Sequence, residues 1–360
     1  MDMPENGGNR LEGDIREAGH HMQACKICGR RATRRLGVPV NVFEARLDEV
    51  PLCEDCFYNY DVKRAEQGYR FERKKALSRK AWVLLALESV RFAKAVERLA
   101  AGPLGRLMAS RAMTILGLAG MVLALGLVVT RFIQLVLSPQ LLEDVRRFFA
   151  EHPLHGALMV PGIDPLIPLV QGWMALIATL FVHEISHAVA AARLGVGEPR
   201  AVGVLLLGPF PVAGYVDVNP SFIKSGKGLR VVAAGIGSNI LLAILCWLGL
   251  SAYALSTGLS IGLHVFFPPE LLSLFGVASP FNDLATGIIC WVGFLSFWLA
   301  IFNAIPILGL DGYYMLAGIL SRIIGAEKAF KLARPVGIFF AGLLVLMVLI
   351  QRIPPFSTTP

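Results

Sequence analysis

Long apolar segments separated by short polar stretches make up most of the chain after residue 112. Five of these segments are long enough to cross the hydrocarbon core of a bilayer, and the fourth lies near the lower limit. They cover residues 113–136, 167–194, 230–255, 285–302 and 336–350. A sixth apolar segment, residues 312–324, is too short to span and is expected to form a helix or a partial insertion. The pattern predicts an all-α polytopic membrane protein with about five transmembrane helices.

One segment before the first span mixes apolar positions with charges. Residues 77–101 include Glu88, Arg91, Lys94 and Arg98, and these charges exclude a membrane span. The pattern predicts an amphipathic helix on the cytoplasmic membrane surface, with its basic side toward anionic lipid. A helix packed on the cysteine-bearing module described below is an equal alternative.

The apolar segment at residues 200–220 contains Gly208, Pro209, Pro211 and Gly214, which exclude a continuous helix. The Val and Leu runs around this break predict two short strands. Irregular backbone at membrane depth is tolerated only against protein or a water-filled cavity. We therefore expect a short β segment near the functional site.

Composition and charge agree with a membrane protein. The chain of 360 residues is 55% hydrophobic, with a mean hydropathy of +0.61, which is too apolar for an ordinary soluble domain. Its net charge of +8 is concentrated in residues 63–111 and in the loops after the second and before the last span, whereas residues 256–283 contain no Lys or Arg. The positive-inside rule predicts a cytoplasmic N-terminus and a multi-pass protein of the cell membrane. Nucleic acid is disfavoured as a partner, because these charges flank membrane segments.

The second span carries the sequence His-Glu-Ile-Ser-His at residues 183–187. Histidines four residues apart share one face of a helix and can bind one zinc ion. The intervening Glu184 then lies beside the water ligand of the metal. Titratable side chains are costly at membrane depth and are functional by default. His183 and His187 are therefore predicted zinc ligands.

A hydrolytic zinc needs a third protein ligand, and Asp311 is the candidate. It follows an apolar run that contains Pro306, and it precedes Gly312. The alternative is that Asp311 only caps the helix that begins near Gly312.

Asn239 is a third polar group at membrane depth, four residues after Gly235 on the same helix face. Glycines permit close helix approach, so the Asn239 side chain can point at the metal and donate to a developing oxyanion. The alternative is a structural hydrogen bond between helices.

These three motifs together resemble the site-2 protease family of intramembrane zinc metalloproteases. The chain has His-Glu-x-x-His in one span, Gly-x-x-x-Asn at residues 235–239 in the next, and Asn-x-x-Pro-x-x-x-Leu-Asp-Gly at residues 303–312. The motifs occur in the family's order, and the resemblance covers about residues 167–324.

The resemblance implies a role for each site residue, and it implies that the site lies in the membrane, nearer the cytoplasm. The zinc ligands would be His183, His187 and Asp311. Glu184 would be the catalytic base, and Asn239 would assist at the reacting carbonyl.

The implied activity is hydrolysis of peptide bonds within or near transmembrane segments of membrane-anchored substrates, as in regulated intramembrane proteolysis. The partners would be transmembrane proteins and the lipid bilayer. Many members of the family carry a PDZ domain, but the loop at residues 256–283 is too short for a domain. We also expect residues 202–218 to hold the unwound substrate by β-augmentation.

Four cysteines near the N-terminus predict a second, structural zinc site. Cys25 and Cys28 form one Cys-x-x-Cys pair, Cys53 and Cys56 form another, and 24 residues separate the pairs. This spacing is typical of a zinc ribbon, with a small β-hairpin between the two pairs. Disulfides are the alternative, although a cytoplasmic location disfavours them. The expected role of the module is to bind a protein partner.

The expected organisation has four parts: a disordered start at residues 1–23, the zinc-ribbon-like module at 24–60, basic amphipathic or juxtamembrane helices at 61–111, and the transmembrane metalloprotease domain at 112–360. The main functional alternative is a catalytically inactive membrane scaffold that binds partners through its ribbon. Another is a membrane zinc protease whose third ligand is a Glu instead of Asp311.

Overall fold

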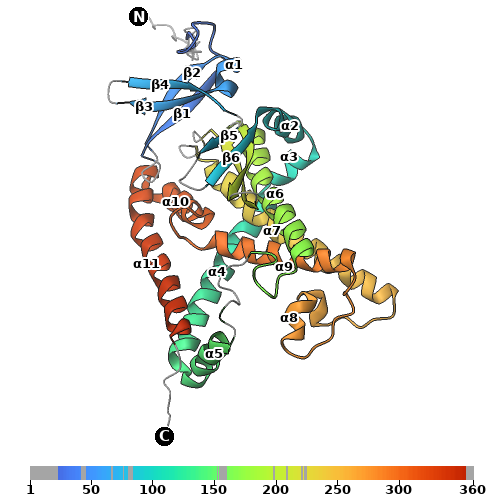
Figure 1. Cartoon of the computed structure of the whole chain (residues 1–360). Coiled ribbons are helices and arrows are strands. Elements are labelled where there is room, and N and C mark those ends of the chain that lie inside the picture. Colours follow the sequence, from blue (N-terminus) through green and yellow to red (C-terminus); the bar gives the residue numbers. More distant parts are fainter. Residues whose placement is uncertain are drawn as a thin grey trace, which may run out of the picture.

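The computed structural model describes residues 23–353 apart from 42–45, 66–67, 76, 80–83, 152, 154–159, 198, 208–209, 220–221 and 223–224. Figure 1 shows the N-terminal strands at one end of the molecule and the helices α5 and α8 toward the other. Except for Gln23, the expected disordered start lies outside the described residues.

Five of the described helices are long and apolar enough to cross a membrane, which confirms the predicted spans to within a few residues at most ends. They are α4 (Arg111–Leu137), α6 (Leu169–Leu194), α7 (Gly228–Ser256), α9 (Leu284–Ala304) and α11 (Ala326–Arg352). The largest difference is α11, which begins ten residues before the predicted span and continues through Pro335. The short sixth segment is the helix α10 (Asp311–Ile324).

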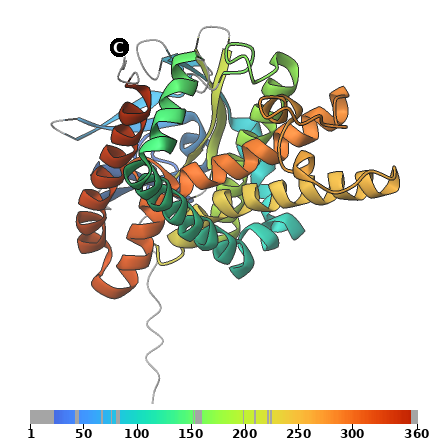
Figure 2. The same cartoon turned by 90° about the horizontal axis from the view of Figure 1, so that it is seen from below.

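The central helix of this bundle is α7. Of its most apolar 18 residues, 56% are buried, whereas the share is 17% for α11. The helix α7 packs on α4, α6 and α9. Figure 2 shows α7 and α9 running beside each other. Small residues permit these contacts, because a Cβ atom on Gly237 would lie 2.6 Å from the Met113 carbonyl oxygen of α4. One polar contact links α6 to α9, where the buried Thr179 and Ser296 hydroxyl oxygens are 3.0 Å apart.

A four-stranded antiparallel sheet lies against the end of α6 that follows the His-Glu-x-x-His motif. Its strands, in spatial order, are β5 (Leu77–Arg79), β6 (Leu84–Ser89), β7 (Pro199–Leu207) and β8 (Phe210–Val218). The predicted pair of strands around the Gly-Pro break is confirmed as β7 and β8. Of the two, β7 is internal and β8 forms an edge of the sheet.

The prediction of one amphipathic helix over residues 77–101 is wrong for its first half. Residues 77–79 and 84–89 are the strands β5 and β6, and only Val90–Ala101 forms a helix, α2. The reason is long-range pairing: β6 lies along β7, with Leu87 opposite Val204, and this partner is more than 100 residues away. A short run of consecutive apolar residues such as 84–87 fits a strand or a helix equally well, and here the pairing with β7 decides.

The helix α2 packs on α6 and β7, and the short helix α3 (Pro103–Met108) continues from it along α6. The helix α2 also contacts the cysteine module, since the Tyr58 hydroxyl donates a hydrogen bond of 2.6 Å to Glu97. This contact agrees with the alternative of a helix packed on that module. Contact of α2 with lipid stays a prediction.

The N-terminal module contains β1 (Arg34–Asn41), β2 (Arg46–Leu52), α1 (Glu54–Asn59), β3 (Tyr60–Ala65) and β4 (Gly68–Arg73). The hairpin expected between the two cysteine pairs is confirmed as β1 and β2. The module extends past the predicted boundary at residue 60, because Val62 is part of its core and Phe71 packs against it. The prediction of juxtamembrane helices from residue 61 is therefore also wrong for β3 and β4.

Two buried polar side chains of the β7–β8 hairpin bind this module. Arg200 is 4% exposed, and its guanidinium donates hydrogen bonds to the carbonyl oxygens of Phe57 and Tyr60. Asn219 is 1% exposed and pairs with the edge of β1, accepting from Gly37 N at 2.9 Å and donating to Arg35 O at 2.6 Å. Buried hydrogen-bonded groups of this kind hold two elements in a defined orientation.

At the opposite end of the bundle, α5 (Pro139–Glu151) packs on α4 and α11, where Arg146 Nε donates to Ile350 O at 3.0 Å. The connection from α7 to α9 contains the short helices η3 (Leu263–Val265) and α8 (Pro269–Ser273). Trp291 of α9 donates to Glu270 of α8 at 3.1 Å, which fastens this connection to the bundle.

We expect Gly117→Ala to destabilise the bundle, because its Cβ would lie 2.8 Å from the Cβ and carbonyl oxygen of Ala233 on α7. Overpacking of this kind typically costs about 1–3 kcal/mol. Gly126→Ala on the same helix is the matched control, since nothing lies within 4 Å of its Cβ. Thermal unfolding in detergent should show a lower midpoint for Gly117→Ala alone, and equal midpoints would contradict this packing.

Candidate metal centre

The helix α6 presents the two histidines of the His-Glu-x-x-His motif on one face. The Nε2 atoms of His183 and His187 lie 3.2 Å apart, and the two rings meet edge to face with centroids 4.8 Å apart. The motif lies two turns before the C-terminal end of α6, where Gly195 adopts a left-handed conformation and ends the helix. Both nitrogens therefore point to the same place inside the bundle.

Asp311 reaches this place from the first residue of α10. Its Oδ2 atom lies 3.0 Å from His183 Nε2 and 3.1 Å from His187 Nε2. The turn before α10 contains Gly309 with φ of 92°, a left-handed conformation that favours glycine. It also brings Gly312 against the end of α9, where a Cβ atom would lie 2.3 Å from the Ala304 carbonyl oxygen. These two glycines allow the tight turn after α9 that places Asp311 beside the two histidines.

The three converging atoms fit a zinc ion. Metal–ligand distances of 2.0–2.2 Å in a tetrahedron require neighbouring ligand atoms to be roughly 3.3 Å apart. The three observed separations of 3.0, 3.1 and 3.2 Å are close to this value. The side chains of His183, His187 and Asp311 are 5%, 14% and 18% exposed, respectively. The three groups are therefore largely desolvated but still accessible to a small ligand. Two histidines and one carboxylate also form a ligand set of hydrolytic zinc enzymes.

A single face of α7 contacts both histidines. The Val231 carbonyl oxygen lies 2.9 Å from His187 Nδ1, and Asn239 Nδ2 lies 3.2 Å from His183 Nδ1. Gly235 stands midway between them, four residues from each, and a Cβ there would lie 2.3 Å from His187 Nε2. The imidazole rings thus pack directly on the backbone of α7. Asn239 lies beside His183, and its expected action on the reacting carbonyl stays a prediction.

Glu184 lies between the two histidines in sequence and faces the sheet. The Glu184 carboxylate lies close to the backbone of Val216 on β8. The carboxylate is partly exposed and close enough to interact electrostatically with His183, His187 and Asp311. This arrangement places a carboxylate between the metal ligands and the edge strand of the sheet.

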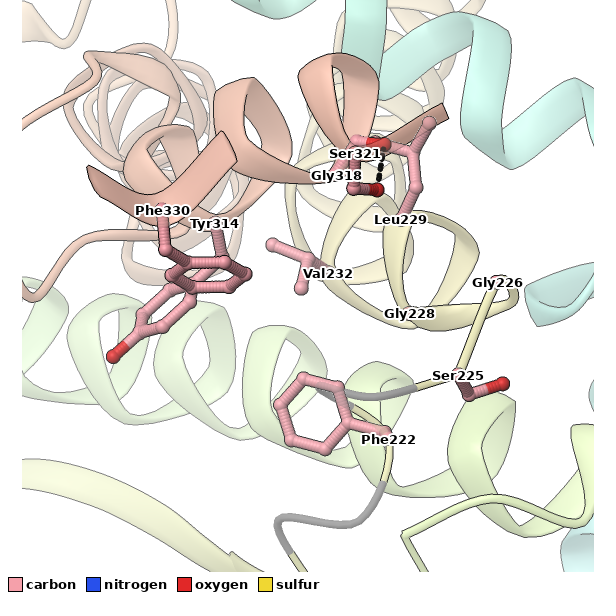
Figure 3. A pocket seen from close by; sticks show the side chains of 10 residues that line it. All are labelled: Phe222, Ser225, Gly226, Gly228, Leu229, Val232, Tyr314, Gly318, Ser321 and Phe330. Atoms are coloured by element: carbon pink, nitrogen blue, oxygen red, sulfur yellow. Dashed lines mark hydrogen bonds between the residues drawn. The ribbon is translucent and has the colours of Figure 1, made fainter. Parts of the chain in front are cut away.

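A small pocket lies between α7, α10 and the segment that follows β8 (Figure 3). Its volume of about 30 Å³ is enough for a water molecule. Tyr314 and Val232 line it, and each is three residues from a residue of the metal site, Asp311 and Gly235 respectively. Residues three apart share a helix face, so the pocket lies about one turn from the metal site along both helices.

The four cysteines of the N-terminal module also cluster as metal ligands. The sulfur atoms of Cys25, Cys28, Cys53 and Cys56 all lie within 4.8 Å of one another, and all four cysteines are free thiols. The 3.5 Å between the Cys28 and Cys53 sulfur atoms is near the roughly 3.8 Å expected in a tetrahedral zinc–thiolate site. Because Arg30 donates a hydrogen bond to Cys28, the pKa of that thiol is lowered to about 6.

Comparison with known proteins agrees with this geometry. Residues 171–346 match the family model of Peptidase family M50, and this region contains His183, His187 and Asp311. The membrane domain of the chain therefore belongs to peptidase family M50, the family of the site-2 proteases. An uncharacterized protein of Methanocaldococcus jannaschii is 31% identical over 72 residues. That match covers 20% of this chain and 20% of the relative, so the chain spans about a fifth of the length of this curated relative. No solved structure matches the chain.

Two contacts of the site were not predicted from the sequence. The Val231 carbonyl acts through the backbone, so its residue type gives no signal. The Val216 amide is part of an edge strand, and the predicted strand pair indicated only that the segment lies near the site. The buried anchors Arg200 and Asn219 had a detectable signal, since both are polar residues at the ends of an apolar segment.

We expect Gly235→Ala to displace His187 and weaken zinc binding at this centre, because the added Cβ would overlap the imidazole. Gly249→Ala on the same helix is the control, since its Cβ meets nothing within 4 Å. Elemental analysis of the purified chain should give two zinc ions for wild type and the control, and about one for Gly235→Ala. Cys56→Ser in the Gly235→Ala chain should remove the remaining zinc. Two zinc ions in Gly235→Ala would contradict this assignment.

Proposed function

We propose that this protein is an intramembrane zinc metalloprotease that cleaves peptide bonds within or near transmembrane segments of membrane-anchored substrates. The observation that carries the proposal is the convergence of His183, His187 and Asp311 at 3.0–3.2 Å inside a bundle of membrane-spanning helices. An inactive scaffold would have no need to keep this ligand set together with Glu184. Membership of family M50 supports the same activity.

His183, His187 and Asp311 would hold the zinc. When bound, the metal supplies Lewis acidity that polarises the substrate carbonyl and acidifies water. Glu184 is placed to accept a proton from the attacking water and to pass it to the leaving amine. The backbone of Val216 on β8 lies close to this carboxylate. The surrounding helices exclude bulk water from these charges, so water must arrive by a defined path.

The pocket beside Tyr314 supports such a path. It lies toward the N-terminal end of α7, the end nearer the sheet and the N-terminal module, and the hydroxyl-bearing residues Ser225 and Ser321 line it (Figure 3). In the proposed topology this is the cytoplasmic side, as the positive-inside rule predicts. The N-terminal module then lies in the cytoplasm, where it is available to a protein partner, and the protein is a multi-pass protein of the cell membrane.

The edge strand β8 is the proposed site for the unwound substrate. A helical segment hides its carbonyl groups in internal hydrogen bonds, so cleavage requires a local extended conformation. An extended peptide can add to the free edge of a sheet through backbone hydrogen bonds. Since β7 is internal, β8 is the strand of the expected pair whose outer edge has no further strand among the described residues, and its Val216 lies close to Glu184.

A photo-crosslinking residue in place of Val216 should capture a single-span substrate in the Glu184→Gln chain, because the substrate strand would lie beside it. The same residue in place of Leu87, exposed on the internal strand β6, is the control and should capture little. Equal capture from both positions, or none from Val216, would argue against strand addition at β8.

Glu184→Gln should lower cleavage of a reconstituted single-span substrate by about 10²–10⁴-fold, because glutamine cannot transfer the proton. Glu151→Gln, an exposed substitution at the end of α5, should cleave at the wild-type rate. Gel analysis of fragments in liposomes measures both rates. Wild-type cleavage by Glu184→Gln would overturn the proposed function.

A further inference from the structure

We infer that Asn239 is a positioning residue that sets the tautomer of His183 through its side-chain oxygen, and so controls zinc binding. The inference rests on the proposed function only in taking zinc as the ion of this site. In this inference Asn239 acts on the metal ligand His183, and its role is not limited to the reacting carbonyl of the substrate. The two histidines are held in different ways by α7.

His187 is held in one tautomer by the backbone. Its Nδ1 atom lies 2.9 Å from the Val231 carbonyl oxygen, and a carbonyl oxygen can only accept a hydrogen bond. Nδ1 must therefore carry the proton and donate it to Val231. In the neutral imidazole the lone pair of Nε2 then points at the metal site, so the contact with Val231 orients His187 as a ligand.

His183 has no such constraint, because its Nδ1 atom faces an amide group. Asn239 is fully buried, and an amide can present either a donor, Nδ2, or an acceptor, Oδ1, to the same neighbour. In the structure Nδ2 lies 3.2 Å from Nδ1, while Oδ1 has no partner among the described residues. This orientation suits a proton on His183 Nε2, which then donates to Asp311 Oδ2 at 3.0 Å.

Zinc binding requires the opposite arrangement. His183 can bind a metal through Nε2 only if the proton moves to Nδ1, and a metal-binding histidine almost always donates this second N–H to an acceptor. Rotation of the Asn239 amide by half a turn replaces Nδ2 with Oδ1 at the same distance. Oδ1 then accepts from Nδ1–H, so both ligand histidines are oriented by α7.

The oxygen and the nitrogen of Asn239 have separable roles. Orientation of His183 needs only the acceptor, whereas donation to a reacting carbonyl needs the Nδ2 hydrogens. Asn239→Asp keeps an acceptor and removes the donor, while Asn239→Leu has a similar size and has neither. Comparing zinc retention in these two variants therefore tests the oxygen alone.

The experiment measures zinc release from the purified full-length chain into a chelator, with total zinc determined by elemental analysis. The four-cysteine site serves as an internal reference, because Asn239 does not touch it. We expect Asn239→Asp to release zinc from the membrane site at a rate within about threefold of wild type. Asn239→Leu should release it about 10–100-fold faster, because losing a partner of a metal-binding histidine typically weakens metal affinity by about this factor.

Thermal unfolding checks that each variant is folded, and Asn239→Ala replaces Asn239→Leu if the larger side chain prevents folding. Wild-type zinc retention in the folded Leu or Ala variant would overturn the inference, as would equally fast release from Asn239→Asp. Neither result depends on cleavage. A failure of the proposed function would instead appear as absence of substrate cleavage by the zinc-loaded wild-type chain.

Discussion

The approach of α6 to α7 at Gly235 is the contact on which the rest of the site depends. Two imidazole rings occupy the space where a side chain at position 235 would be, and a single added carbon would lie 2.3 Å from His187 Nε2. This contact lets the Val231 carbonyl and the Asn239 amide reach the outer nitrogens of the two rings. A wider separation of the helices would leave the histidines free to rotate, and converging ligand atoms would no longer be held in place.

The same constraint extends to the opposite face of α7. A helix held this close to α6 must also pack on α4, and here too the contacts are made by small residues, Ala233 and Gly237 on α7 and Gly117 on α4. The position of Asp311 depends on another close contact, because Gly312 lets α10 begin directly against the end of α9. The metal centre is thus defined by backbone approach at several helix contacts, and the titratable residues occupy positions that this packing creates.

The sheet connects this centre to the N-terminal module. The hairpin of β7 and β8 lies beside Glu184 at Val216, and it holds the module through Arg200 and Asn219. Asn219 follows Val216 by only three residues, so a displacement of the module would act on the strand beside the Glu184 carboxylate. The module and the membrane domain therefore share one structural element.

The parts of this structure that were predictable from the sequence are those in which residue type alone carries the signal. The spans follow from apolar length, and His183, Glu184, His187 and Asp311 stand out because ionisable groups are costly in apolar segments. The strands β5 and β6 were predicted as a helix, because their conformation is set by pairing with β7, far along the chain. The orienting contact from Val231 is made by backbone, which no residue pattern reveals.

The most direct test of this account is to map the cut in a single-span substrate by mass spectrometry after cleavage by the purified chain in liposomes, with Glu184→Gln as the blank. The account predicts a new terminus inside the apolar segment or at its cytoplasmic border, absent from the blank. A cut far from the membrane, or the same fragments in the blank, would contradict it.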